Sequence, residues 1–443
     1  MQTYQGKKLP YHSNLMVTVP GSKSITNRAL LLAALAEGRS ILDGVLFSDD
    51  SNVFLQALRD LGFTVEVDEK ALRVALQGMG GRVPRSNANI YVGSAGTAAR
   101  FLTAMTAMTV GKFRLDASAQ MKKRPMKELF DALTELGAGV HYLCDEGTFP
   151  VYVTGIGHRQ ERGELSLNID RSSQFLSALL MTAPSHFDDM TIHLTGQRSA
   201  LSYVRMTEQM MKQFGHAGVE QESERCYRVE GRKGYRAQNY TVEPDVSAAC
   251  YFYAMVPLLG IPVCVEHVHF ESLQGDVEFL RILEKMGCTA QDTEKGVLLL
   301  PTSALSDAGT QTPAFHGVTV DMSSCSDQAI TLAAIAPFAD SPTCITGIGH
   351  IRFQESDRIH AICTELTRMG IRCEETQDSI TIYPGTPKPC TVATYDDHRM
   401  AMGFALTGLR TEGIVIDDPG CCRKTFENYF EVLDQVITEI SEG

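Results

Sequence analysis

The chain repeats one pattern of helix and strand about every 75 residues, and this restricts its fold more than any other feature. An amphipathic helix that ends in glycine and leads into an apolar strand occurs five times. Glycine suits this place because the residue after a helix often takes a left-handed conformation. A sixth such helix, FENYFEVLDQVITEI, closes the chain without strands after it. The helix-ending glycines are Gly62, Gly137, Gly215, Gly287 and Gly370.

A second, more apolar helix precedes each glycine-ended helix, and a short β-branched strand such as MTIHLTG or VCVEHVHF joins the two. Each repeat therefore reads strand–helix–strand–helix–strand–strand, which predicts an α/β fold. Helices that are apolar nearly all round belong in a core, so we expect them to be buried and the glycine-ended helices to be more exposed. The apolar helices are NRALLLAALA, TAARFLTAMTAM, SSQFLSALLMTA, SAACYFYAMVPLL, DQAITLAAIAPF and HRMAMGFALTGL.

Six repeats without a low-complexity linker favour two domains of three repeats each. We expect the chain to cross between these domains near Pro20-Gly21 and again near Glu243-Pro244. One domain then holds residues 21–242 with repeats 1–3. The other is discontinuous and holds residues 1–20 and 243–443 with repeats 4–6.

Composition excludes several classes of partner. A net charge of −13 over 443 residues disfavours non-specific binding to nucleic acid or to an anionic membrane surface. The N-terminus lacks the apolar core of a signal peptide, and no run of about eighteen apolar residues follows, so we expect a cytoplasmic protein with no membrane partner.

The twelve cysteines include no C-x-x-C pair. They fit reduced thiols better than zinc sites or disulfides, and four stand in strongly apolar surroundings: Cys250, Cys264, Cys344 and Cys363.

Polar residues recur at the start of the apolar helix in every repeat. Capping of free N–H groups is a sufficient explanation for Ser172 and Asp245. It does not explain Lys23, Arg171 or Arg399, because a cation is unfavourable at the positive end of a helix dipole unless an anion is bound there. The six helix starts carry Ser22-Lys23-Ser24, Gly96-Thr97, Ser172-Ser173-Gln174, Asp245 and Ser247, Asp327-Gln328, and Asp397-His398-Arg399.

Cations also recur in the loop before the glycine-ended helix. Any one of them could be an ordinary solvated charge, but an acidic chain has placed them at equivalent positions. Because arginine binds carboxylate and phosphate with two hydrogen bonds, their convergence predicts substrates with more than one anionic group. The residues are Lys122, Lys123, Arg124, Arg198, Arg205, Arg352, Arg358, Arg423 and Lys424.

Asp327, Glu355 and Lys424 stand among these cations and are candidates for proton transfer. Each acid also has a structural interpretation, as a helix cap or an ion-pair partner. No nucleophilic triad can be identified, and His267-x-His269 is a weak metal pattern, so we expect neither metal nor cofactor. The segment GSKS lacks the spacing of a nucleotide-binding P-loop, which disfavours nucleotide hydrolysis.

Seven segments resemble, in order and spacing, the signature segments of the EPSP synthase family of enolpyruvyl transferases. They are PGSKSITNRALLLAALAEG, GSAGTAARFL, KRPM, SSQFLSALL, ESDRI, DDHRMAM and KTFENYF, and they run from about Pro20 to the C-terminus. The resemblance implies a two-domain, inside-out α/β barrel with three βαβαββ repeats and inward-facing helices in each domain. It places the active site in the cleft between the domains.

The same resemblance implies the reaction. The carboxyvinyl group of phosphoenolpyruvate would pass to the 5-hydroxyl of shikimate 3-phosphate through a tetrahedral intermediate, with release of phosphate, in aromatic amino-acid biosynthesis. We expect these small anions to be its partners and the chain to be a monomer. Asp327 would accept the proton of the attacking hydroxyl, and Glu355 with Lys424 would manage the proton at the methylene carbon.

Binding residues follow from the resemblance position by position. Contacts to shikimate 3-phosphate would come from Lys23, Ser24, Arg28, Ser172, Ser173, Gln174, Tyr203, Asp327 and Gln354. Contacts to phosphoenolpyruvate would come from Lys23, Gly96, Arg124, Gln174, Arg358, Arg399 and Lys424. Because Gly96 leaves room for the inhibitor glyphosate, we expect sensitivity to it.

The sequence departs from the family pattern at four places. Gln354 stands where the family usually has lysine, and its loss of a cation affects binding of the acceptor more than the chemistry. His350 and Ser94 stand where asparagine is common. The serine expected near residue 200 is displaced, since Ser199 and Ser202 flank Ala200.

Two alternatives stay open. A related family transfers the enolpyruvyl group to UDP-N-acetylglucosamine on the same fold, but it carries a reactive cysteine in the loop that reads MKKRPM here. The second alternative is a non-catalytic protein that binds a phosphorylated metabolite. Its only support is Gln354, which replaces the lysine that is usual in the family. The presence of Asp327, Glu355 and Lys424 argues against it.

Overall fold

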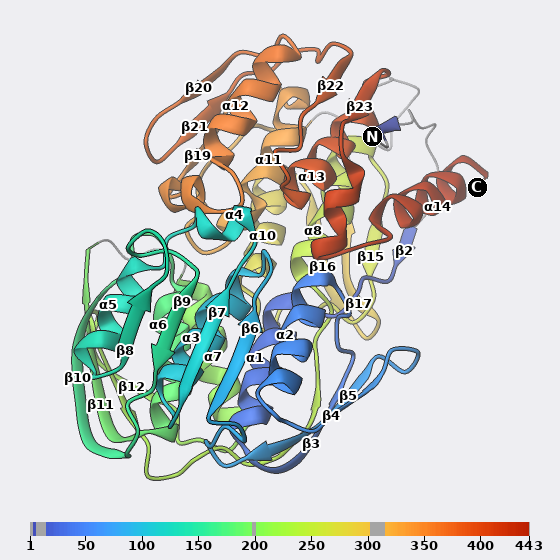
Figure 1. Cartoon of the computed structure of the whole chain (residues 1–443). Coiled ribbons are helices and arrows are strands. Elements are labelled where there is room, and N and C mark those ends of the chain that lie inside the picture. Colours follow the sequence, from blue (N-terminus) through green and yellow to red (C-terminus); the bar gives the residue numbers. More distant parts are fainter. Residues whose placement is uncertain (1–2, 6–14, 197–200, 302–314, 443) are drawn as a thin grey trace. The chain divides into compact units, whose positions relative to one another are not determined.

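The computed structural model describes residues 3–5, 15–196, 201–301 and 315–442. The chain divides into two units, which are described separately (Figure 1). Unit 1 comprises Met1–Pro20 and Glu243–Gly443, and unit 2 comprises Gly21–Val242.

Three apolar helices form the centre of unit 2 and pack against one another. Every residue of α3 is buried, and in α1 only the first two residues are partly exposed. The predicted burial of these helices is confirmed, because side chains that are apolar on all faces leave no face suited to water. The inner helices are α1 (Lys23–Leu35), α3 (Gly96–Ala107) and α6 (Gln174–Thr182), which η1 (Ala183–Ser185) extends. The other helices are α2 (Asp49–Asp60), α4 (Ala119–Lys122), α5 (Lys127–Glu135) and α7 (Leu201–Gln213).

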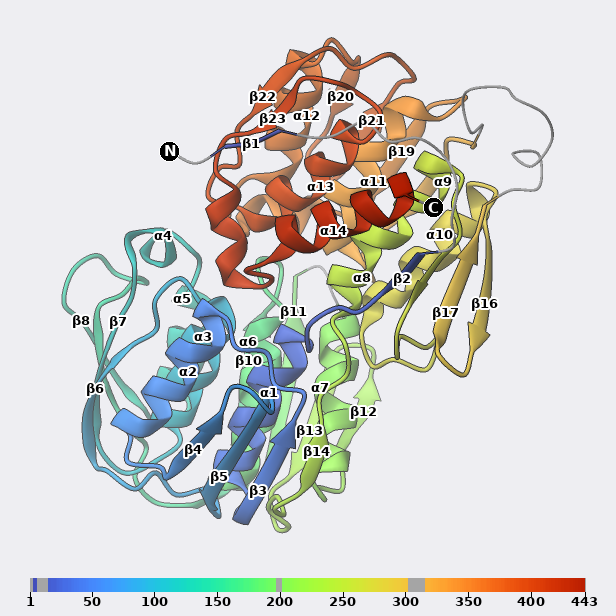
Figure 2. The same ribbon diagram turned by 90° about the vertical axis from the view of Figure 1, so that its right-hand side faces the viewer.

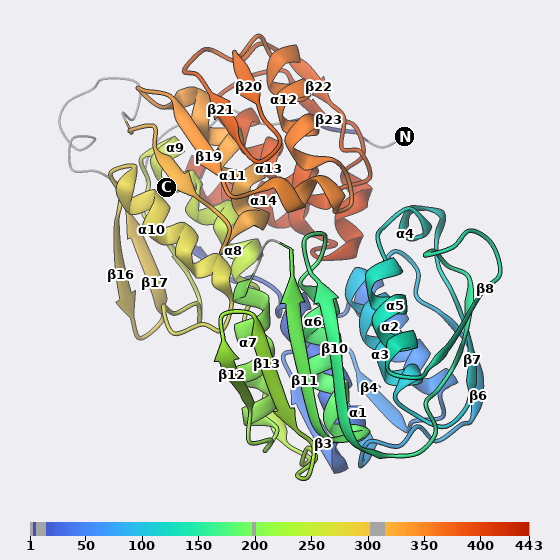
Figure 3. The same ribbon diagram turned by 90° about the vertical axis from the view of Figure 1, so that its left-hand side faces the viewer.

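Three four-stranded sheets surround these helices. In each sheet the first two strands are parallel and the last two strands of the repeat pair antiparallel. Figure 2 shows the first sheet beside α1, and Figure 3 shows the third lying over α6 and α7. The first is β14 (Asn239–Thr241), β3 (Glu37–Asp43), β5 (Arg73–Met79), β4 (Val65–Asp68). The second is β6 (Asn87–Tyr91), β7 (Lys112–Asp116), β9 (Val151–Thr154), β8 (Gly139–Tyr142). The third is β10 (Gln160–Asn168), β11 (Phe187–Thr195), β13 (Cys226–Glu230), β12 (Val219–Ser223).

Unit 1 repeats this plan around one apolar core. Its inner helices are α8 (Val246–Tyr253) with α9 (Met255–Leu259), α11 (Ala329–Ile335) and α13 (His398–Gly408). Figure 1 shows α11 and α13 side by side inside it. The outer helices are α10 (Glu278–Lys285), α12 (Arg358–Arg368) and α14 (Tyr429–Glu442). Short 3₁₀ turns are η2 (Gly275–Val277), η4 (Ser326–Gln328), η5 (Ala336–Phe338), η6 (Gly349–Phe353) and η7 (Pro419–Lys424).

The sheets of unit 1 differ in one respect from those of unit 2. The first is β2 (Leu15–Val17), β15 (Val263–Val265), β17 (Gly296–Leu300), β16 (Thr289–Thr293). The second is β18 (Thr319–Asp321), β19 (Thr343–Thr346), β21 (Ile380–Ile382), β20 (Cys373–Glu375). The third has three strands, β22 (Cys390–Val392), β23 (Ile414–Ile416) and β1 (Tyr4–Gln5). The antiparallel strand β1 takes the place of the strands that the sixth repeat lacks.

Two strands belong to one unit, whereas the helix that follows each of them in the sequence belongs to the other unit. The strand before α1 is β2, and it pairs in parallel with β15 of unit 1. The strand before α8 is β14, and it pairs in parallel with β3 of unit 2. Each unit therefore closes its first sheet with a strand from a distant part of the sequence.

The predicted glycine ends of the outer helices are confirmed. All five glycines have positive φ, from 79° at Gly370 to 113° at Gly287, where a side chain would strain the backbone. The outer helices are also the more exposed, since α10 buries only four of its residues.

Three details differ from the prediction. The apolar helix SAACYFYAMVPLL is divided into α8 and α9, because Pro257 has no N–H to donate to the carbonyl of Tyr253. The strand VCVEHVHF ends at Val265, because His267 turns the chain with a φ of 60°. All twelve cysteines lie in the described part of the chain and are free, and Cys344 and Cys363 are partly exposed rather than buried.

Candidate active site

Arg358 is the centre of a cluster of acids and cations in unit 1. It is the first residue of α12, and its side chain is 2% exposed. Its guanidinium donates from Nε to Asp397 Oδ2 at 2.8 Å, from Nη1 to Asp327 Oδ1 at 2.8 Å and from Nη2 to Glu355 Oε2 at 2.7 Å. Burial opposes the charge of Arg358, but these carboxylates outweigh it and raise the pKa of the guanidinium above its usual range.

Two further cations complete the cluster. Arg399 Nη2 lies 2.8 Å from Asp327 Oδ2, and Lys424 Nζ lies 3.2 Å from Glu355 Oε1. Asp327 is therefore held between two arginines, and Glu355 between an arginine and a lysine. The structure brings these five predicted residues together from η4, α12, α13, η7 and the loop before α12. The helix-cap interpretation of Asp327 is wrong, since the residue lies within η4 and its carboxylate faces cations. For Asp245 the cap is confirmed by a bond from the N–H of Ala248 at 2.9 Å.

The departures at Gln354 and His350 lie at the edge of this cluster. Gln354 directly follows η6 and is partly buried. His350 lies within η6, and its Nε2 is 2.8 Å from the hydroxyl of Ser326, the residue before Asp327. Burial lowers the pKa of His350, so the ring is neutral near pH 7. The hydroxyl of Ser94, in unit 2, bonds that of Ser118 at 2.7 Å.

Arg28 is buried in unit 2, and its hydrogen-bond partners among the residues that the structure describes are all neutral. It donates to the carbonyl of Ser24 at 2.9 Å, the hydroxyl of Thr207 at 2.8 Å and, less closely, to the carbonyl of Tyr203 and the hydroxyl of Ser177. No carboxylate among the described residues forms an ion pair with it, and burial lowers its pKa to about 10. The guanidinium is therefore charged at pH 7 and has no carboxylate partner within the described part of the chain, which favours binding of an anion.

Two arginines lie against Gly96, the first residue of α3. A β-carbon at this position would come 2.8 Å from Nη2 of Arg124 and 2.9 Å from Nη1 of Arg100. Arg100 is itself fixed, since Nη1 donates to the carbonyl of Gly96 at 3.1 Å and Nη2 to that of Pro125 at 2.8 Å. The glycine therefore lets two guanidinium groups approach the start of the helix.

The other predicted residues of unit 2 also lie at helix starts. Lys23 begins α1, and its Nζ is 3.8 Å from Asp50 Oδ2. Gln174 begins α6, and its Oε1 is buried without a hydrogen-bond partner among the described residues. Ser172 accepts from the N–H of Gln174 at 3.3 Å, as capping predicts, and Ser173 is buried beside it. Arg198 and Ser199 lie outside the described residues.

Three features of the structure are absent from the sequence prediction: Arg100, the pairing of Asp397 with Arg358, and Asp276. A single charge within a helix that is otherwise apolar all round, as in TAARFLTAM, could have identified Arg100. Asp276 stands at the loop position where other repeats carry cations, so alignment of the repeats could have singled it out.

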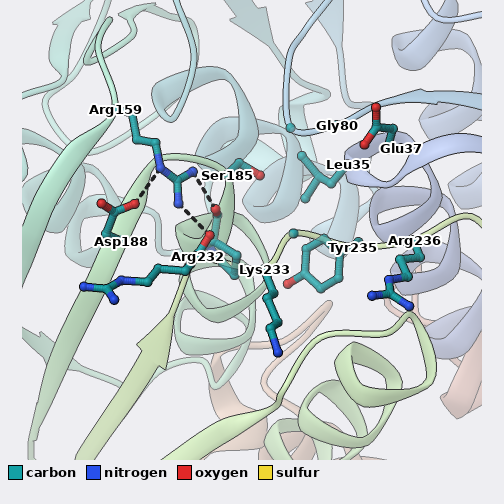
Figure 4. Close-up of a pocket in the computed structure, with 14 residues that line it drawn as sticks. Leu35, Glu37, Gly80, Arg159, Ser185, Asp188, Arg232, Lys233, Tyr235 and Arg236 are labelled. Atoms are coloured by element: carbon teal, nitrogen blue, oxygen red, sulfur yellow. Dashed lines mark hydrogen bonds and ion pairs between the residues drawn. The ribbon is translucent and has the colours of Figure 1, made fainter.

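A hollow of about 860 Å³ in unit 2 lies at the other end of the inner helices. Leu35, the last residue of α1, and Ser185 line it, together with four cations. Arg159 pairs with Asp188 at 2.7 Å. In Figure 4 the remaining cations point in different directions and do not converge on one centre: Arg232, Lys233 and Arg236. This geometry is not that of an anion site.

Among the described residues, no group of three or more His, Cys, Asp and Glu side chains is arranged to hold a metal ion. No helix in the described part of the chain has the length and hydropathy needed to cross a bilayer.

Comparison with known proteins identifies the family of the chain. The sequence matches the EPSP synthase (3-phosphoshikimate 1-carboxyvinyltransferase) family over residues 12–433. It is 42% identical over 423 residues to the 3-phosphoshikimate 1-carboxyvinyltransferase of Nostoc punctiforme, covering 96% of each chain. It is 40% identical to the chloroplastic enzyme of that name from Brassica napus, covering 95% of this chain and 83% of the other. The structure superimposes on EPSP synthase from Acinetobacter baumannii with a TM-score of 0.78 at 25% identity, over 98% of this chain and 97% of that one. The chain therefore belongs to the EPSP synthase family, the 3-phosphoshikimate 1-carboxyvinyltransferases.

Proposed function

We propose that this chain transfers the carboxyvinyl group of phosphoenolpyruvate to the 5-hydroxyl of shikimate 3-phosphate and releases inorganic phosphate. The observation that carries the proposal is the cluster around Arg358, where two acids are each held between two cations. Family membership supplies the reaction, and the buried Arg28 supplies a site for an anion in the other unit.

The two units divide the work in this proposal. Unit 2 binds the phosphate of shikimate 3-phosphate through Arg28, Lys23 and the nearby hydroxyl groups, because the charge of Arg28 has no carboxylate to offset it among the described residues. The other contacts to this substrate come from Ser24, Ser172, Ser173, Gln174, Tyr203, Asp327 and Gln354. Those to phosphoenolpyruvate come from Lys23, Gly96, Arg124, Gln174, Arg358, Arg399 and Lys424. Both clusters then serve one pair of substrates.

The chemistry consists of an addition and an elimination. In the addition, Asp327 accepts the proton of the 5-hydroxyl while the oxygen of this hydroxyl bonds to C2 of phosphoenolpyruvate. Glu355 and Lys424, 3.2 Å apart, deliver a proton to the methylene carbon C3. In the elimination, the same pair removes a proton from C3, the bond from C2 to the phosphate oxygen breaks, and phosphate leaves. Arg358 and Arg399 stabilise the charges of both steps.

Phosphate release from phosphoenolpyruvate tests this function. The purified chain is offered shikimate 3-phosphate and, in a separate reaction, UDP-N-acetylglucosamine. We expect release with shikimate 3-phosphate alone. Release with UDP-N-acetylglucosamine alone would assign the chain to the other acceptor. Binding of both substrates without release in either reaction would show a binding protein.

Monomeric state and cytoplasmic location complete the proposal. Light scattering of the purified chain should give a mass near 48.6 kDa. A mass of twice that value would refute the monomer.

Gly96→Ala should weaken the binding of phosphoenolpyruvate. The new methyl group would lie within 3.0 Å of the guanidinium groups of both Arg124 and Arg100, so both must shift. Because Arg100 is held by its hydrogen bonds to Gly96 and Pro125, some loss of stability should accompany the change. We expect KM for phosphoenolpyruvate to rise about 10-fold, the loss of roughly one charged hydrogen bond. Glyphosate should inhibit the parent enzyme and inhibit the variant less, because the added methyl group occupies the space beside residue 96 that the inhibitor would need.

Gly234→Ala is the matched control, since no heavy atom lies within 4 Å of a β-carbon there. Its KM values should equal those of the parent. An unchanged KM for phosphoenolpyruvate in Gly96→Ala would remove Arg124 and Gly96 from the site.

A further inference from the structure

A buried carboxylate with no part in the proposed chemistry lies close to Asp327. Asp276 belongs to η2, just before α10, and is only 5% exposed. Its Oδ2 accepts hydrogen bonds from Nε2 of Gln328, at 3.0 Å, and from the hydroxyl of Ser247. Among the described residues, no lysine or arginine forms an ion pair with it. Hydrogen bonds hold the carboxylate, and the positive charge of Arg399 acts on it without a direct ion pair.

The first of these bonds fixes the segment that carries Asp327. Gln328 directly follows Asp327 in η4 and is completely buried. On the other side, Ser326 is bonded to His350 at 2.8 Å. Both neighbours of Asp327 are thus anchored to other segments, and Asp276 is the anchor on the C-terminal side.

The second bond, to Ser247, connects Asp276 with the carboxylate of Asp327 through Arg399. Ser247, in α8, accepts a hydrogen bond from Nη2 of Arg399 at 3.4 Å, and the same Nη2 lies 2.8 Å from Asp327 Oδ2. Asp276 orients the hydroxyl of Ser247 by accepting its hydrogen bond, so that the lone pairs of this hydroxyl face Arg399.

This arrangement costs folding free energy. Burial and the negative charge of Asp327 raise the pKa of Asp276 from 3.8 to about 6. A group whose pKa is raised in the folded state favours folding when protonated, so its contribution is lost as pH rises from about 4 to 6. A chain under no functional constraint would be more stable at pH 7 with a neutral residue here.

We propose that Asp276 is a positioning residue for the proton acceptor, which fixes Asp327 through Gln328 and fixes Arg399 through Ser247. The inference rests on the proposed function, in which Asp327 accepts the proton of the attacking hydroxyl. Asp276 acts through these neighbours and transfers no proton to or from the substrates.

Kinetics of four variants test the inference, with phosphate release measured against each substrate. Asp276→Ala removes both hydrogen bonds, and we expect kcat to fall about 10- to 100-fold because the reacting groups are misplaced. Asp276→Asn keeps a carbonyl oxygen for both donors, so kcat should return to within about 5-fold of the parent. Gln328→Met cuts the first route and should lower kcat alone. Ser247→Ala cuts the second and should raise KM for phosphoenolpyruvate, since Arg399 loses a partner.

Stability gives an independent reading. The unfolding free energy of Asp276→Asn minus that of the parent, measured with urea, should increase as pH rises from 4 to 6, and the variant should be the more stable of the two at pH 7. A merely structural role predicts lower stability of Asp276→Ala with normal kinetics. Glu365→Gln is the control, because Glu365 is a fully buried carboxylate of unit 1 that bonds Tyr395 at 2.7 Å. Its kcat should stay within about 2-fold of the parent.

The outcomes separate this inference from the proposed function. A parent chain that releases no phosphate with shikimate 3-phosphate overturns the proposed function, and the inference with it. An active parent with a folded Asp276→Ala of unchanged kcat overturns the inference alone, and so does an Asp276→Asn as slow as Asp276→Ala. If Asp276→Ala does not fold, unchanged kinetics in both Gln328→Met and Ser247→Ala overturn it.

Discussion

Glu355→Gln is expected to lower kcat by about 10² to 10⁴, the usual contribution of a positioned acid or base. Glutamine keeps the volume of the side chain and can accept from Arg358, but it cannot exchange a proton with C3 of phosphoenolpyruvate. KM values should change much less, because Arg358, Arg399 and Lys424 all remain. The measurement is steady-state phosphate release with both substrates.

The stability of Glu355→Gln has to be measured alongside its activity. The substitution weakens the charged hydrogen bond to Arg358 and removes the charge that pairs with Lys424, so unfolding should cost about 1.5–3 kcal/mol less than in the parent. Glu375→Gln breaks an ion pair to Arg352 outside the cluster and serves as the control, with activity close to that of the parent. A kcat within 10-fold of the parent in a folded Glu355→Gln would mean that Glu355 does not move the proton.

Arg28→Met is expected to lower the affinity for shikimate 3-phosphate by about 10- to 150-fold. This is the loss of a charged hydrogen bond worth about 1.5–3 kcal/mol. The stability of the free protein should change little or increase, because methionine replaces a buried charge that has no carboxylate partner in the described structure. Affinity and stability should thus move independently.

A thermal shift or urea titration with shikimate 3-phosphate distinguishes the two effects. At a ligand concentration of 100 Kd the parent gains about 2.7 kcal/mol, and a variant with 100-fold weaker binding gains only about 0.4 kcal/mol at that concentration. Arg228→Met is the control, since Arg228 of unit 2 has its own carboxylate partner, Asp189, at 2.8 Å. If Arg28→Met retained the full stabilisation by ligand, the phosphate would have to bind elsewhere.

Much of the candidate site could be predicted from the sequence because its residues stand at helix starts. Lys23, Gly96 and Gln174 each begin an inner helix of unit 2, and local capping chemistry with apolar periodicity locates such starts. What these residues contact could not be predicted. The uncompensated charge of Arg28 depends on Thr207, which lies 179 positions further along the chain.

The sequence by itself determined the repeat, the burial of its apolar helices and the glycine that ends each outer helix. These features depend on interactions within a few residues, so period and composition carry them. Only the tertiary structure decided that β2 pairs with β15 and that β14 pairs with β3, because strand pairing depends on which sheet has an open edge. The tertiary structure alone also decided that Asp327 faces Arg358 and Arg399, which lie 31 and 72 residues away in the sequence. The same holds for the hydrogen bond between Asp276 and Gln328, the residue after Asp327. Such contacts follow from the packing of whole repeats, which no local pattern of residues encodes.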